Sequence, residues 1–479
     1  MKNSKQLLRN LGVYGFDHLE LVIIASLVSE DPLLLIGKAG TGKTYLLNTL
    51  SEALGLEHRH YNASFLSFDD LVGFPYPDSN GESVSFLKTP ATIWGAESVL
   101  IDELSRCKAE IQNKFFSIIQ EKKLQGIALN HLRYRWAAMN PIVSENSDSD
   151  DFYEGSISLD QALADRFAFI IEVPDWSELT IEEQELVIYP AGEGATTGNS
   201  NELIKLIAEL RPKFLKQIQT PTRDIITYCR IISTLLGNAG LRISPRRARL
   251  LARNFTALFL VAKANGLGSD EKSLGGIFKL GLRWSLPHRA WKSKLPDHVI
   301  DSAHAECMKV VLKSNQQERW LSEFILAPTL SAKINMLLYD LVSKEAKSLA
   351  VLQLIRQKSP TQNAIFAFSA QPILADSNLI DEEALNALTA ISTKIMRVDG
   401  QLEWREQLSV KNSNHPTWSS CAHYINSLSD DQPLRKKRAK QLLLYLVCND
   451  IDVPEPEFIE TQLNDCFQLL SGYYVSKNE

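Results

Sequence analysis

The stretch that decides the fold is LLLIGKAGTGKTYLLNTL, which runs from Leu33 to Leu50. Its first four residues form an apolar run typical of a buried strand, and the residues after Lys43 place apolar side chains at helical spacing. Between them, GKAGTGKT fits the pattern GxxxxGK followed by Ser or Thr. The backbone N–H groups of such a loop can surround phosphate oxygens, and the dipole of the following helix favours negative charge there. A glycine-rich turn without a ligand is the alternative, which the flanking pattern disfavours.

Two side chains of this loop have expected roles toward a bound nucleotide. Lys43 would reach the β- and γ-phosphates, and the hydroxyl of Thr44 would ligate Mg²⁺. The nucleotide-binding residues expected from the motif are Gly37, Lys38, Ala39, Gly40, Thr41, Gly42, Lys43, Thr44 and Tyr45. The sequence therefore predicts a nucleoside triphosphate and Mg²⁺ as cofactors.

The region from Asp17 to about Pro174 alternates short apolar runs with helical periodicity, as βαβ units do. Buried parallel strands are predicted at Leu33 to Ile36, Ser98 to Ile101 and Tyr134 to Met139. Helices are predicted between them, such as Thr44 to Leu54 and Lys108 to Gln120. The expected fold class is an α/β P-loop core with a doubly wound parallel sheet, followed by helical domains.

The chain changes character after Pro174, where strand signals fade and amphipathic helical stretches dominate. Residues Ala191 to Asn201 form a flexible loop by composition, and a further break falls between Trp284 and His298. We predict a nucleotide-binding core at residues 1–175, a helical lid at 176–285 and a helical C-terminal domain at 286–479. No motif indicates what the C-terminal domain does.

Two adjacent carboxylates, Asp102 and Glu103, follow the predicted strand Ser98 to Ile101. In a nucleotide-hydrolysing site, Asp102 would hold Mg²⁺ through water and Glu103 would polarise the attacking water as general base. Alone, such a pair is more often a solvated strand end. Its place one strand after the glycine-rich loop favours the functional interpretation.

Three further residues lie where strands or helices begin or end. Asn140 follows the strand that ends at Met139 and could orient the attacking water, although Asn-Pro is also a common turn pair. Arg166 precedes a final apolar strand and could reach a neighbouring subunit's γ-phosphate; a surface salt bridge is the alternative. Arg246 lies in the first turn of a helix capped by Ser244, which would aim it toward a bound nucleotide. The alternative for Arg246 is a solvated basic helix start.

These elements, in this order, resemble the AAA+ family, and finer strings resemble its MoxR-type branch, which includes the NorQ and CbbQ activators. DELSRC, which starts at Asp102, is similar to the branch's DE-hydrophobic-N-R-A string; AAMNP resembles its sensor 1 and SPRRA its sensor 2. Gln112-Asn113 and the helix to Gln120-Glu121 resemble its "QN…EE" helix in part, because Gln120 replaces a usual Glu. Tyr153 to Ser156, with LDQALADRF, resembles its arginine-finger stretch. The resemblance covers roughly residues 10–290, with a Ser- and Asp-rich insertion at Ser144 to Asp151.

The resemblance implies an ATP-hydrolysing ring motor, expected to be a hexamer, in which Arg166 of one subunit completes the site of the next. It also implies a chaperone-like remodeller or activator of a protein client, with a separately encoded partner that carries a von Willebrand factor A domain. Two other readings stay open. One is a nucleotide-driven nucleic-acid translocase similar to McrB, and the other is a nucleotide-gated scaffold that does not work as a motor. Intact Glu103 and Arg166 disfavour the scaffold.

A hairpin is expected after Asp69 to Phe74, because Asn80-Gly81 between alternating segments indicates a tight turn. The resemblance places Phe74, Tyr76 and Phe86 of this hairpin near a central pore. The alternative is a surface hairpin whose aromatic residues pack underneath. By the same resemblance, Arg106 is a candidate second arginine acting across the subunit interface.

The composition, with 44% hydrophobic and 23% charged residues, is that of a soluble globular protein. A net charge of −6 gives no broad basic field, which disfavours non-specific nucleic-acid binding. The basic run Pro433 to Gln441 is more readily interpreted as a solvated helix start than as a nucleic-acid patch. The six scattered cysteines are expected to be reduced thiols. No apolar run is long enough to span a bilayer, so we expect a cytoplasmic protein without membrane insertion.

Overall fold

The computed structural model describes residues 6–77, 84–87, 89–107, 109–142, 157–189, 200–267, 270–291, 295–313, 315–356, 359–397, 418–429, 431–453 and 455–478. Contacts divide the chain into two compact units, unit 1 (Met1–Met308) and unit 2 (Lys309–Glu479). Features expected outside the described residues are the Asn80-Gly81 turn, the Ser144 to Asp151 insertion, Tyr153 to Ser156 and most of the Ala191 to Asn201 loop. The division at residues 175 and 285 into core, lid and C-terminal domain stays a prediction.

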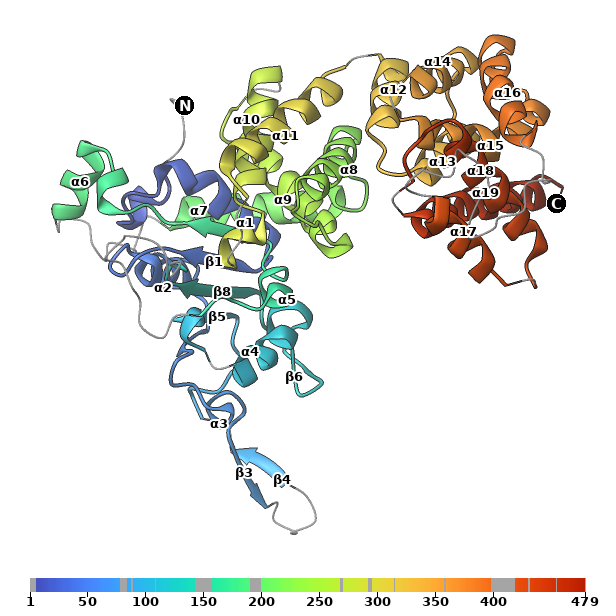
Figure 1. Cartoon of the computed structure of the whole chain (residues 1–479). Helices are drawn as coiled ribbons and strands as arrows, with labels where there is room; N and C mark the ends of the chain where they lie inside the picture. The colour runs from blue at the N-terminus through green and yellow to red at the C-terminus, as the bar shows by residue number, and fades with distance from the viewer. Residues whose placement is uncertain are drawn as a thin grey trace. The chain divides into compact units, whose positions relative to one another are not determined.

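Unit 1 is built on a five-stranded sheet with the order β2-β5-β8-β1-β9 (Figure 1), and every neighbouring pair in it is parallel. Its strands are β1 (Leu33–Ile36), β2 (His58–Asn62), β5 (Ser98–Asp102), β8 (Tyr134–Met139) and β9 (Phe169–Glu172). β1 and β8 are buried along their whole length, as expected for strands that are covered on both faces. The predicted α/β P-loop fold with a parallel sheet is confirmed.

Helices cover both faces of this sheet. Alternate residues of β1 show it: Leu33 and Leu35 belong to one buried cluster, Leu34 and Ile36 to another. The helices of unit 1 are α1 (Glu20–Ser29), α2 (Lys43–Ala53), α3 (Phe68–Val72), α4 (Ala109–Phe116), α5 (Gln161–Ala164), α6 (Ile181–Ile188), α7 (Asn201–Gln217), α8 (Arg223–Asn238), α9 (Pro245–Ala264), α10 (Glu271–Arg283) and α11 (Asp297–Val311), whose last residues fall in unit 2. Shorter turns are η1 (Arg9–Leu11), η2 (Asp17–Leu19), η3 (Leu104–Arg106), η4 (Ser117–Glu121), η5 (Trp176–Glu178) and η6 (Pro287–Ala290).

The helix α9 fixes the helical part of unit 1 onto the sheet. Arg253 on α9 makes two hydrogen bonds to Asp31, of 2.8 and 2.9 Å, just before β1. The next residue, the buried Asn254, donates to the carbonyl of Ala168 at 2.8 Å, just before β9. Charge-assisted and buried hydrogen bonds of this kind hold a geometry more firmly than exposed ion pairs.

Two antiparallel pairs of short strands lie outside the main sheet: β3 (Phe74–Pro77) with β4 (Val84–Leu87), and β6 (Lys123–Leu124) with β7 (Ile127–Ala128). The β3–β4 pair extends away from the rest of unit 1 (Figure 1). Phe74, Tyr76 and Phe86 are 55%, 47% and 40% exposed. The aromatic side chains of this hairpin are therefore open to solvent, which disfavours the alternative in which they pack underneath.

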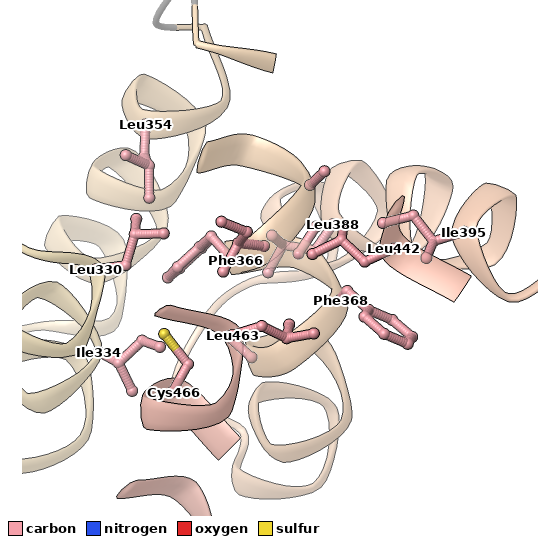
Figure 2. Packing of buried hydrophobic residues seen from close by; sticks show 14 of the residues in the cluster. Leu330, Ile334, Leu354, Phe366, Phe368, Leu388, Ile395, Leu442, Leu463 and Cys466 are labelled. Carbon is pink, nitrogen blue, oxygen red and sulfur yellow. The ribbon is translucent and has the colours of Figure 1, made fainter. Parts of the chain in front are cut away.

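Unit 2 is helical throughout its described residues and is built around α15. Its helices are α12 (Gln316–Leu326), α13 (Leu330–Tyr339), α14 (Lys344–Arg356), α15 (Pro360–Ser377), α16 (Glu382–Arg397), α17 (Trp418–Ser427), α18 (Pro433–Cys448) and α19 (Pro456–Asn478). Residues 364–370 of α15 are all buried, as in a helix surrounded by neighbours. Figure 2 shows Phe366 of α15 among Leu388 of α16, Leu442 of α18 and Leu463 of α19.

The basic run at the start of α18 is partly used in packing inside unit 2. Arg435 pairs with Glu460, which is 1% exposed, at 2.6 Å between Nε and Oε1. The guanidinium of Arg438 lies 3.7 Å from the ring centre of Phe467. These two arginines therefore hold α18 against α19, which disfavours a nucleic-acid patch there.

The remaining sequence expectations concern cysteines and membrane spans. All six cysteines are free, and five of them are buried. Trp284, Trp320 and Trp418 are buried core residues. Among the described residues, no helix combines the length and the apolar character that crossing a bilayer requires.

Candidate functional site

The glycine-rich loop between β1 and α2 takes the shape that its sequence predicts. Gly42 has a φ of 81°, in the left-handed region that favours glycine, and immediately precedes α2. A Cβ on Gly37 would lie 2.9 Å from Oγ1 of Thr41 and 3.0 Å from Cβ of Val173, so a side chain at this position would force a neighbouring side chain to move. The loop closes on itself because Oγ1 of Thr41 donates to the carbonyl of Lys38 at 2.8 Å.

Lys43 fills the space that this loop encloses. Its Nζ donates to the carbonyls of Gly37 and Lys38, both at 2.7 Å, and the residue is 8% exposed. Burial lowers the pKa of Lys43, against the charges of Asp102 and Glu103, which raise it. A bound phosphate would replace these neutral carbonyls with anionic oxygens, which are stronger partners for an ammonium group.

Asp102 lies at the end of β5, beside the loop. Its Oδ2 accepts from Oγ1 of Thr44 at 2.8 Å and lies 3.3 Å from Nε2 of His60, while its Oδ1 accepts from the amide of Glu103 at 2.8 Å. Burial alone would raise the pKa of Asp102, but these three hydrogen bonds outweigh it and hold the pKa below its usual value. The carboxylate oxygens of Asp102 and the hydroxyl of Thr44 are the hard donors that Mg²⁺ prefers, so the residues fit this ion.

Glu103 adopts a left-handed backbone conformation, with a φ of 56°, which is uncommon for a residue with a side chain. Its Oε2 lies 3.0 Å from Nε of Arg106, one turn of η3 away. Arg106 therefore has an ion-pair partner inside its own subunit, which the sequence analysis did not predict. In this arrangement the proposed general base is paired with a cation.

Asn140 completes this edge of the sheet. It follows β8, which lies between β1 and β5, and it is 6% exposed. The amide of Gly37 donates to the carbonyl of Met139 at 3.2 Å, so the end of β8 is tied to the start of the glycine-rich loop. Parallel strands present their carboxyl ends at one edge, and the structure brings Asn140 to the same edge as Gly37 and Asp102.

Arg166 and Arg246 lie together around Asp165, at the end of α5. Arg166 donates to the carbonyl of Ala162, and its guanidinium lies 4.3 Å from the ring centre of Phe116. Arg246 pairs with Asp165 at 3.3 Å. Burial lowers the pKa of Arg166, and the positive charge of Arg246 lowers it further. Arg246, expected to point toward a bound nucleotide, thus contacts the carboxylate next to Arg166; its role toward a nucleotide stays a prediction.

Arg247 is a structural partner of the same carboxylate that the sequence analysis did not single out. It is fully buried, lies 3.3 Å from Oδ1 of Asp165, and donates to the carbonyl of Ser285 at 2.8 Å. Burial lowers its pKa to about 10, against the charge of Asp165. The adjacent arginines Arg246 and Arg247 differ in this way because successive helical positions face different sides.

A cavity of about 380 Å³ opens beside the glycine-rich loop, within the size range of small-ligand sites, roughly 300–1,000 Å³. It is lined by residues 12–16 before α1, by Tyr45, by the segment from Pro174 to Trp176 and by Leu186 of α6. The hydroxyl of Tyr45 donates to the carbonyl of Gly12 at 3.3 Å. The largely apolar lining next to a phosphate-binding loop suits a nucleobase. Sequence analysis missed this cavity because its walls come from segments far apart in the chain.

A family described as the AAA domain of the dynein-related subfamily matches residues 32–167 of this chain. The matched residues run from β1 to just before β9 and include Lys43, Asp102, Glu103, Asn140 and Arg166. A solved structure of a Cytophaga hutchinsonii protein, described provisionally as an ATPase, is also similar. It shares 19% sequence identity, covers 62% of this chain and 92% of its own, and has a TM-score of 0.46. Residues 32–167 of this chain are thus similar to an AAA domain.

Proposed function

We propose that this chain is an ATP-hydrolysing ring motor of MoxR type that remodels or activates a protein client. The observation that carries the proposal is the contact between Thr44 and Asp102, 2.8 Å apart, directly beside the loop that Lys43 fills. A P-loop hydroxyl and a strand-end carboxylate in contact are the arrangement that metal-assisted phosphoryl transfer requires. Glu103, the next residue, then has the place of the general base.

The residues of one subunit supply binding and the proton acceptor. Lys43 would exchange the carbonyls of Gly37 and Lys38 for phosphate oxygens, and Thr44 and Asp102 would hold Mg²⁺, which neutralises charge on the phosphates. Glu103 would leave Arg106 to accept a proton from the attacking water, which Asn140 would orient. The cavity lined by Tyr45 and residues 12–16 would hold the adenine ring.

A second subunit would supply the arginine. The charged groups that most affect the pKa of Arg166 are Arg246 and Asp165, whereas those that affect the pKa of Lys43 are Asp102 and Glu103. Arg166 and Lys43 therefore lie among different charged groups of the same subunit. Nε of Arg166 is buried and has no hydrogen-bond partner among the described residues. A γ-phosphate of the neighbouring subunit would supply that partner. Arg246, which pairs with the adjacent Asp165, would face the same neighbouring site. A closed ring, expected to be a hexamer, would give the Arg166 of every subunit such a phosphate partner.

The client would contact the β3–β4 hairpin. Phe74, Tyr76 and Phe86 present exposed aromatic surface on an element that extends from the sheet, and exposed apolar surface of this kind is typical of protein-contacting sites. The protein nature of the client, and the separately encoded von Willebrand factor A partner, rest on the resemblance to the MoxR branch. We place the protein in the cytoplasm because no apolar run in the sequence is long enough to span a bilayer.

The ion pair between Glu103 and Arg106 favours one competing reading, a scaffold that binds ATP and hydrolyses it slowly. A nucleic-acid translocase similar to McrB is disfavoured, because Arg435 and Arg438 in the most basic run of the chain are engaged within unit 2.

Phosphate release separates these readings. We would measure it for the wild type and for Glu103→Gln, with ATP and with GTP, while light scattering follows the mass of the assembly. A ring motor predicts that the wild type assembles and hydrolyses ATP, whereas Glu103→Gln assembles without turnover. Glu52→Gln, which makes the same change on the exposed side of α2, is the matched control and keeps its activity.

Other outcomes would point elsewhere. Assembly of the wild type with ATP but without turnover would support the scaffold. Preference for GTP, with turnover stimulated by DNA, would support the translocase. Unchanged turnover in Glu103→Gln would contradict the assignment of the general base.

A further inference from the structure

An imidazole stands beside the expected metal ligands. His60 lies on β2, whose register pairs Asn62 with Asp102. Its Nε2 lies 3.3 Å from Oδ2 of Asp102, the same oxygen that accepts from Thr44 at 2.8 Å. A hydroxyl and an imidazole therefore meet at one carboxylate oxygen, next to the glycine-rich loop.

These donors do not form a metal site by themselves. Among the described residues, no group of three or more His, Cys, Asp or Glu side chains is placed to hold a metal ion. His60 and Asp102 are only two such groups, and Thr44 adds a neutral oxygen. The remaining coordination positions require phosphate oxygens or water, so metal binding at this place depends on a bound nucleotide.

The chemistry of the donors differs in a way that selects between metals. Carboxylate and hydroxyl oxygens suit Mg²⁺, whereas imidazole suits the later first-row ions, whose affinity for nitrogen rises along the Irving–Williams series. The side chain of His60 is 37% exposed, so its ring is open to a ligand that enters from solvent. A neutral imidazole donates from Nε2 to Asp102 in one tautomer and offers the Nε2 lone pair to a metal ion in the other.

Building on the proposed nucleotide site, we propose that His60 selects the metal that accompanies the nucleotide. With Co²⁺, Ni²⁺ or Zn²⁺, Nε2 of His60 enters the coordination sphere beside Thr44 and the phosphate oxygens. With Mg²⁺, the ring stays outside the sphere and donates a hydrogen bond to Asp102. The site then binds nucleotide complexes of the later ions more tightly than those of Mg²⁺, and His60 is the residue responsible.

The first measurement is metal affinity in the presence of ADP, for the full chain and for His60→Gln. Glutamine keeps a polar side chain at the position but removes the imidazole. We expect the Kd for Co²⁺ to rise about tenfold in His60→Gln, the lower end of what loss of a metal-site partner costs, and the Kd for Mg²⁺ to change less than about threefold. His131→Gln, a change at an exposed histidine before β8, is the control and leaves both values unchanged. Equal losses for Co²⁺ and Mg²⁺ would show that His60 only orders Asp102 and would overturn the proposal.

The second measurement identifies the ligand directly, with ADP and Cu²⁺, a paramagnetic member of the later first-row ions, as the probe. Pulsed electron paramagnetic resonance of the bound Cu²⁺ is expected to show nitrogen modulation that changes when the protein carries ¹⁵N-labelled histidine and disappears in His60→Gln. Bound Cu²⁺ without histidine modulation would overturn the role of His60 and leave the nucleotide site standing. Failure of the wild type to bind Cu²⁺ with ADP at all would overturn the nucleotide site as well.

Discussion

Two groups of charged side chains in unit 1 differ in how their charges are matched. At the end of β5 lie two carboxylates, Asp102 and Glu103, whose charges raise the pKa of the nearby Lys43. At the end of α5, a single carboxylate, Asp165, is shared by Arg246 and Arg247, with Arg166 as its neighbour in sequence. We call these the phosphate edge and the arginine edge. The phosphate edge has the groups that are expected to hold a nucleotide and its metal, and at the arginine edge two arginines share one carboxylate next to a third arginine.

The difference indicates that each edge is half of a site. A partly buried guanidinium group is costly unless an acceptor is available for each N–H, because buried N–H groups need hydrogen-bond partners. Nε of Arg166 has no acceptor among the described residues. Stacking the phosphate edge of one subunit on the arginine edge of the next would satisfy both. The following changes would break or sharpen this comparison.

Removing the finger from the arginine edge has the largest expected effect. In Arg166→Ala, kcat for ATP falls about a thousandfold, because the charge that stabilises the transition state is lost. The affinity for nucleotide stays within a few fold, because binding belongs to the phosphate edge. Turnover and equilibrium binding of a fluorescent ATP analogue check this. A large loss of affinity with kcat preserved would place Arg166 in nucleotide binding instead.

Arg247 distinguishes the structural from the functional arginines of the same edge. Arg247→Met breaks the buried pair with Asp165 and leaves the carbonyl of Ser285 without its donor, so we expect a loss of about 3 kcal/mol in the free energy of unfolding. Arg246→Met, at the half-exposed neighbour, is the matched control and costs less than about 1 kcal/mol. Urea denaturation measures both. Equal losses of unfolding free energy in the two variants would contradict the assignment of Arg247, but not Arg246, as a structural residue.

Lys43 tests the phosphate edge. Lys43→Ala removes the ammonium that would meet the phosphates, and we expect the Kd for ATP to rise about a hundredfold, as loss of a charge-assisted contact implies. Lys38→Ala, in the same loop, removes a cation that pairs at 3.2 Å with Asp175. We expect the Kd for ATP to change less than about fivefold in Lys38→Ala. Isothermal titration of both variants checks the prediction, and equal losses would contradict it.

The smallest predicted effect concerns the pH dependence of stability. Burial lowers the pKa of His288 to about 4, so between pH 6.5 and 4 the unfolded chain binds more protons than the folded one. Stability therefore falls as the pH falls through this window, by about 1–2 kcal/mol for this residue at pH 5. Urea denaturation at pH 7 and pH 5 should show a smaller pH dependence in His288→Gln. His298→Gln, at an exposed position of α11, keeps the wild-type dependence, and a match between the two variants would contradict the assignment.

The strands that sequence analysis predicted are those that are buried on both faces. β1 and β8 begin and end where predicted, and β5 extends one residue further, to Asp102. β2 was not predicted, because HRHYN is polar and lies at the edge of the sheet, where only Tyr61 is buried. Periodicity identifies strands through buried apolar side chains, and β2 has too few of them.

The candidate site was predictable where a motif is local and not where it is assembled by the fold. The glycine-rich loop, Asp102 and Glu103 follow from contiguous strings. The ion pairs of Arg246 and Arg247 with Asp165 depend on how α9 packs against α5. The contact between His60 and Asp102 depends on the register of β2 and β5. In unit 2, amphipathic periodicity predicted helices, but the central place of α15 depends on tertiary packing.

The most direct test of a divided site mixes two inactive variants. Glu103→Gln has an intact arginine edge, and Arg166→Ala has an intact phosphate edge. If the site lies between subunits, mixing the two proteins under conditions of ring assembly restores ATP hydrolysis, because some interfaces then join Glu103 of one subunit to Arg166 of the next. If each site is formed within one chain, the mixture stays as inactive as its components, and the proposed ring mechanism is wrong.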